Sequence, residues 1–73
     1  MSENILLRVP GQYIGAALNT LPKAESATLD IMEATIEVPC IGTVRVTAKR
    51  FKSKHGKTLM YFWSAEKAVA LGQ

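Results

Sequence analysis

The sequence has few of the residues that catalytic and metal-binding sites require. Its 73 residues include one histidine, His55, and one cysteine, Cys40. A single cysteine cannot form an internal disulfide, and one cysteine with one histidine cannot complete a tetrahedral zinc site. The five glycines are dispersed and form no phosphate-binding loop. We therefore expect a non-enzymatic protein of a reducing compartment, with no metal and no cofactor.

Long apolar segments are also missing. Apolar runs such as residues 5–7 and 60–63 are far shorter than the roughly 20 residues that span a bilayer. The N-terminus, Met-Ser-Glu-Asn, has no basic region before its apolar residues, so it does not resemble a secretory signal. The sequence predicts a cytoplasmic protein without a membrane partner.

What is present suffices for one folded unit. Hydrophobic residues make up 48% of the chain and charged residues 21%, which is typical of globular proteins. A chain of this length can bury one modest core, and no repeat or linker divides it. We expect a single domain over residues 1–73 that is monomeric.

The charges are segregated along the chain, whose formal net charge is +3. Four of the six acids lie between positions 25 and 37 with no base among them, and six of the nine bases lie between positions 45 and 57 with no acid. Segregated charge steers a protein towards an oppositely charged partner. We predict that the basic group is the partner-binding site. Its members are Arg45, Lys49, Arg50, Lys52, Lys54 and Lys57.

The first half of the chain predicts a strand, a helix and a second strand. Residues 4–9 are rich in branched apolar residues and end at a Pro-Gly turn signal, which favours a strand. Residues 12–21 carry apolar side chains at three- and four-residue spacing, which predicts an amphipathic helix. In the segment that follows, the alternation of apolar and polar residues shifts by one position near Glu33, which is a slip in the strand phase. Either a bulge absorbs the slip, or residues 24–32 form a helical turn before a strand over residues 34–38; we favour the turn.

The second half predicts a hairpin and a final helix. After a turn at residues 39–42, residues 43–49 alternate between apolar and polar side chains, as a strand with one buried face does. A break at residues 52–57 separates them from residues 58–63, which are rich in strand-forming side chains. Ser64 is a suitable cap for a helix over residues 65–71.

The expected fold class is therefore α+β: a small antiparallel sheet with a basic-tipped β-hairpin and two short helices. Only one phase of the aromatic residues on the last strand can face the core. The core residues predicted from these patterns are Leu6, Ile14, Leu18, Ile36, Val44, Val46 and Phe62 or its strand neighbours.

Two residues with reactive side chains have simple structural interpretations. His55 lies between a lysine and a glycine at the predicted hairpin tip, where it is expected to be an exposed turn residue and not a general base. Cys40 is expected to be a small buried hydrophobe.

The basic hairpin also has aromatic neighbours at Phe51 and at residues 61–63. Lysines can neutralise phosphates and exposed aromatic rings can stack on bases, so a nucleic-acid-binding module is one interpretation. In the other, half of the aromatic rings enter the core and the lysines solvate the tip. We favour the second, and keep direct contact with DNA or RNA as the alternative.

Four features of the chain carry a resemblance to a known family. They are its length, the compact start at Met1, the absence of catalytic motifs, and the basic segment over residues 42–51, Gly-Thr-Val-Arg-Val-Thr-Ala-Lys-Arg-Phe. In these features the chain resembles the small phage-encoded RNA polymerase-binding transcription regulators of the Xanthomonas phage type. The resemblance implies a protein that binds host bacterial RNA polymerase, inhibits transcription initiation and can promote antitermination. It assigns no role to individual residues.

Overall fold

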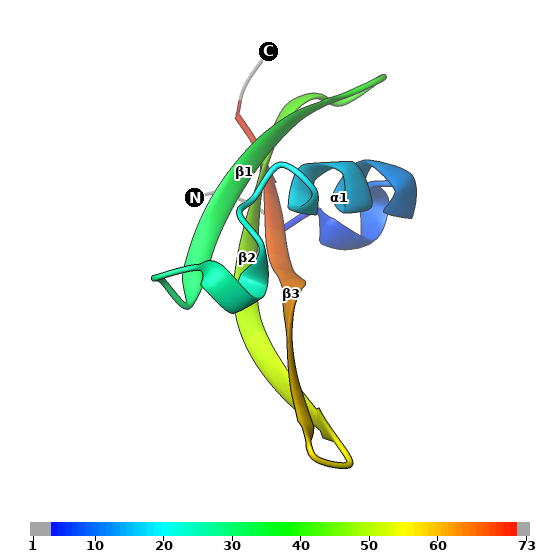
Figure 1. Ribbon diagram of the computed structural model, residues 1–73. Coiled ribbons are helices and arrows are strands. Elements are labelled where there is room, and N and C mark those ends of the chain that lie inside the picture. The colour runs from blue at the N-terminus through cyan, green and yellow to red at the C-terminus, as the bar shows by residue number, and fades with distance from the viewer. Residues whose placement is uncertain (1–3, 72–73) are drawn as a thin grey trace.

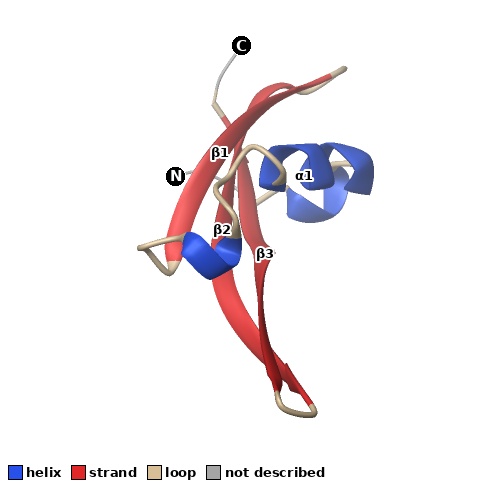
Figure 2. Ribbon diagram, in the orientation of Figure 1, coloured by secondary structure: helices blue, strands red, loops and turns tan. Residues whose placement is uncertain are grey.

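A computed structural model describes residues 4–71 as a three-stranded antiparallel sheet with one α-helix and two single turns of 3-10 helix (Figures 1 and 2). The strands lie in the order β1-β2-β3, so each pairs with the next one along the chain. In chain order the elements are η1 Leu6–Arg8, α1 Gly11–Leu18, η2 Ala24–Ser26, β1 Ile31–Val38, β2 Gly42–His55 and β3 Thr58–Ala70.

The helix packs on one face of the sheet, here called the α1 face (Figure 1). Val44 and Val46 of β2 are fully buried on this face, and Val46 lies opposite Ala34 of β1 and Ala68 of β3. Ala17 of α1 packs in the same buried cluster and has no exposed surface. The core is therefore small, and it lies over the half of the hairpin nearest the chain termini.

The hairpin is much longer than the core beneath it. The last pair between β1 and β2 is Ile31 with Lys49, whereas β2 and β3 stay paired as far as His55 and Thr58. Residues 50–63 thus form a two-stranded ribbon, here called the arm, that projects beyond β1 and α1 (Figure 1). The molecule measures 46 × 21 × 19 Å as a result.

Two elements differ from the sequence prediction. Residues 4–9 form no strand: the side-chain oxygen of Asn4 accepts the N–H groups of Leu6 and Ala68, at 3.0 and 3.1 Å, and the chain turns into η1. The predicted helix over residues 65–71 is also wrong, because β3 continues to Ala70. The register between β2 and β3 shifts between Thr47 and Ala48, where a bulge accommodates one extra residue of β3. Pairing with β2 overrides the local helix preference of these residues.

The remaining predictions are confirmed in part. The helix begins near the expected position but ends at Leu18. Over residues 24–32 the favoured alternative is confirmed in part: a helical turn, η2, precedes the strand, but it ends at Ser26, and β1 already starts at Ile31. The apparent phase slip arises because Leu29, which shares the phase of Ile31, lies outside the strand, and Ile31 itself is exposed on the face opposite α1.

Burial follows the predicted core with one exception. Leu6, Ile14, Leu18 and Ile36 pack against the buried cluster while staying partly exposed. Phe62 does not belong to that cluster. It lies on the arm and faces away from α1, while Tyr61 and Trp63 of the other phase stay half-buried, so neither phase of the aromatic residues is fully buried there.

Candidate partner-binding arm

The arm ends in a two-residue turn that its sequence allows. His55 pairs with Thr58, which leaves Gly56 and Lys57 at the tip. Gly56 has φ of 62°, a left-handed conformation that glycine adopts without strain and that the first turn residue of a type II′ hairpin requires. The tight turn lets both strands of the arm remain in register to their ends.

Side chains alternate between the two faces of the arm. On the α1 face the cross-strand pairs match a base with an aromatic or apolar residue: Arg50 with Trp63, Lys52 with Tyr61, and Lys54 with Leu59. On the opposite face Phe51 pairs with Phe62 and Ser53 with Met60.

The predicted binding residues are therefore divided between these faces. Lys52 and Lys54 extend from the α1 face, Lys49 lies on the opposite face, and Lys57 is at the tip. All four are exposed, and none of them forms an ion pair within residues 4–71. The four lysines form an open basic surface around the outer half of the hairpin.

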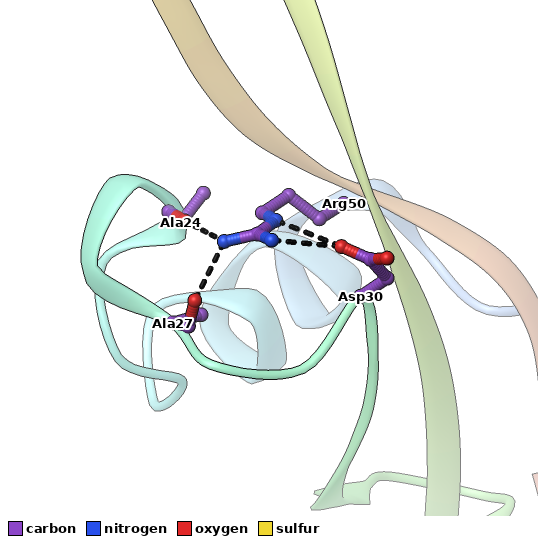
Figure 3. Close-up of polar contacts among 4 residues, drawn as sticks. All are labelled: Ala24, Ala27, Asp30 and Arg50. Carbon is purple, nitrogen blue, oxygen red and sulfur yellow. Dashed lines mark hydrogen bonds and ion pairs between the residues drawn. The ribbon is translucent and has the colours of Figure 1, made fainter.

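Arg50 has a different role (Figure 3). Its guanidinium donates to the carboxylate of Asp30 through Nε and Nη2, at 3.2 and 2.8 Å. Its Nη1 donates to the carbonyl oxygens of Ala24 and Ala27, at 3.0 and 2.6 Å. Four donor contacts are thus directed into the chain, and Arg50 ties the segment between η2 and β1 to the base of the arm.

Arg45 is also engaged within the fold. It lies on the face opposite α1, beside the core half of the sheet, and its Nε is 3.7 Å from a carboxylate oxygen of Glu33. Glu37, two residues further along β1, accepts a hydrogen bond from Thr43. The acids of β1 thus balance the polar side of β2, and Arg45 is separated from the arm.

A second contact joins the arm to the loop before η2. The indole N–H of Trp63 donates to the carbonyl oxygen of Pro22 at 2.8 Å. The neighbouring Tyr61 ring lies under the Arg50 guanidinium, with 5.4 Å between Cζ and the ring centroid. Together these contacts fix the loop from Pro22 to Asp30 across the α1 face at the base of the arm.

A groove of about 710 Å³ lies between this loop, the end of α1 and the arm. Leu18, Lys23 and Glu25 form part of its wall, and residues 58–63 of β3 form the other side. The sequence analysis missed this groove. Its signal is the two-residue spacing of Leu59, Tyr61 and Trp63, which places them on one face of a strand.

The opposite face of the arm carries an exposed aromatic pair. The rings of Phe51 and Phe62 stack with centroids 5.4 Å apart, and 47% of Phe51 remains exposed. Lys49 is two residues from Phe51 on the same strand and face. This arrangement places a lysine beside a small aromatic surface.

The reactive side chains lie apart from each other. His55 is exposed at the end of β2, with its Nε2 3.3 Å from the Ser53 hydroxyl. Cys40 is exposed, with φ of 70° in the β1–β2 turn, so the prediction that it is buried is wrong. Among residues 4–71 no three His, Cys, Asp or Glu side chains lie close enough to hold a metal ion.

No helix in the described part of the chain is long and apolar enough to cross a membrane. Comparisons with protein-family models, with curated proteins and with solved structures return no match.

Proposed function

We propose that the protein is a non-enzymatic cytoplasmic regulator that uses the arm to bind an acidic surface of host bacterial RNA polymerase, and thereby inhibits initiation or promotes antitermination. The observation that carries the proposal is the projecting ribbon: its three lysines, and Lys49 at its base, are exposed and have no acidic partner among residues 4–71. The resemblance to phage transcription regulators supplies the identity of the partner.

The projection of the arm suits binding to a larger protein. A ribbon that extends past the core can present both faces to a larger protein while the core stays unchanged. Exposed lysines at the rim of an interface mainly accelerate encounter, since their fields act over a Debye length of about 10 Å at 0.1 M salt. We assign the contact to Lys49, Lys52, Lys54 and Lys57. Arg45 and Arg50 support the fold beside them.

The test is binding of purified bacterial RNA polymerase to the immobilised chain, together with recovery of polymerase subunits from a bacterial lysate. The triple variant K52E/K54E/K57E should associate about tenfold more slowly or worse at low salt, and its affinity should depend less on salt. The single variants K54E and K67E form a matched pair, because Lys67 is exposed and lies off the arm. Equal binding by the triple variant and the native chain would remove the arm from the contact.

The exposed stack of Phe51 and Phe62 beside Lys49 favours single-stranded nucleic acid as a second candidate ligand. Stacking on an aromatic side chain contributes about 1–3 kcal/mol per base. An oligonucleotide titration discriminates the two functions: F51A should lose affinity for the oligonucleotide if bases stack there, and should leave the affinity for polymerase unchanged if the lysines make the contact alone.

A further inference from the structure

The outer edge of β3 is open along the arm and closed elsewhere. Next to the core, the N–H of Ile5 donates to the carbonyl oxygen of Ala68 at 2.8 Å, and the N–H of Ala68 donates to the side chain of Asn4 at 3.1 Å. Asn4 and Ile5 therefore cover this part of the edge as a neighbouring strand would. Within the described residues 4–71, no backbone contact of this kind covers residues 58–63.

The hydrogen-bond phase of the arm follows from one contact. The N–H of Arg50 donates to the carbonyl oxygen of Asp30 at 2.7 Å, so it points away from β3. Residues opposite each other in an antiparallel pair either exchange both hydrogen bonds or exchange none. Trp63 lies opposite Arg50, so its N–H and C=O also point away from β2, at the free edge.

The same phase extends along the strand. Tyr61 and Leu59 are two and four residues from Trp63, so their backbone groups also point outwards. Within residues 4–71 no hydrogen bond reaches the backbone of these three residues. An exposed edge of this kind is a template for pairing with another strand.

The groove beside this edge indicates what would pair with it. An added strand would place one side-chain phase next to Leu59, Tyr61 and Trp63, where apolar groups are favoured. Lys23 stands in the groove wall, and Lys52 extends from the same face. Glu25 is the one acid that lines the groove, so the two lysines outnumber it. This positive balance favours a ligand with carboxylates.

We propose that residues 59–63 of β3 form a strand-addition site that takes an extended segment of the protein partner, apolar on its groove-facing side and acidic overall. The inference rests on the proposed function, because it makes this segment part of the acidic partner. Main-chain hydrogen bonds would supply affinity, and the groove would select the side chains. A second copy of the chain is disfavoured, since pairing through this edge would bring two lysine-rich arms together.

The experiment uses the full chain and a capped peptide of about nine residues, long enough to span the edge, with valine alternating with threonine and glutamates at both ends. Amide hydrogen exchange reports the site residue by residue. Binding should slow exchange at the outward N–H groups of Leu59, Tyr61 and Trp63, and should leave Met60 and Phe62 unchanged, since these already bond to β2. Uniform change along the arm, or no change, would overturn the proposal.

Two substitutions at one position separate the backbone from the side chain. Leu59→Pro removes the outward N–H without removing a bond to β2, and proline is tolerated on edge strands in that orientation. Leu59→Ala keeps the N–H and loses the same side chain, so it is the matched control. We expect L59P to weaken peptide binding about tenfold more than L59A does, and equal losses would contradict strand addition.

The polymerase assay distinguishes this inference from the proposed function. If L59P binds polymerase as L59A does while K52E/K54E/K57E does not, the arm binds polymerase and strand addition is refuted. If neither arm variant affects polymerase binding but the peptide protects the outward amides, the edge is a strand-addition site for a different partner and the proposed function is refuted.

Discussion

Replacing Arg50 with methionine should detach the loop from Pro22 to Asp30 without disturbing the hairpin. Methionine keeps the unbranched stem of the side chain and removes the guanidinium. The carbonyl oxygens of Ala24 and Ala27 then lose the guanidinium donor, and the carboxylate of Asp30 loses its cation. The Tyr61 ring loses the charge above it.

The magnitude follows from the exposure of these groups. The two carbonyl contacts are partly buried and donated by a charged group, so each contributes about 1 kcal/mol. The Asp30 side chain is 76% exposed, which limits its ion pair to about 0.5 kcal/mol. Arg50→Met should therefore cost about 2–3 kcal/mol, which lowers the Tm of a domain of this size by about 10–20 °C.

The assay is urea unfolding, combined with hydrogen exchange at residues 24–30. Asp30→Asn should cost less than about 1 kcal/mol, because the carbonyl contacts remain. Lys52→Met is the matched control, since it removes an exposed cation from the adjacent position on the same face and should change stability by about 0.5 kcal/mol or less. Equal effects of Arg50→Met and Lys52→Met would refute the anchoring role of Arg50.

Two further contrasts test the turn and the core by thermal unfolding. Gly56→Ala should destabilise the protein by about 1 kcal/mol because φ is positive, whereas Gly15→Ala in α1 should stabilise it by about 0.5–1 kcal/mol; a Cβ meets nothing within 4 Å at either position. Ala68→Leu should cost about 1–3 kcal/mol because this residue has no exposed surface, while Ala70→Leu, exposed on the same strand, should cost much less. Equal costs within either pair would contradict the packing described here.

Local alternation predicted the centre of the fold. Val44 and Val46 were expected on the buried face and Arg45 on the other, and the structure confirms both. The same two-residue period, continued by one position, puts Lys49 and Arg50 on opposite faces, as observed. These features depend only on the two-residue repeat of a strand, so they can be predicted from the local sequence alone.

The end of β3 could not be predicted in the same way. Residues 64–71 combine a serine cap with alanine, glutamate and lysine, all of which suit a helix. In the structure a small side chain is needed here for packing. Ala68 lies opposite Val46 and packs in the core cluster with Ile5. Pairing with a strand about 20 residues away decides the conformation, and no local pattern records it.

The role of Arg50 shows why a run of bases in sequence is not one surface. Adjacent strand residues point to opposite faces, so a run of six divides as soon as the strand forms. Arg50 is then closest to Asp30 and to the carbonyl groups of Ala24 and Ala27, contacts that span 20 to 26 residues. If the basic surface binds through charge alone, Lys49→Glu on one face and Lys52→Glu on the other should weaken binding equally. If a partner strand pairs with the edge of β3 above the groove, Lys52→Glu should weaken binding several-fold more, because Lys52 shares the face of the groove and Lys49 does not.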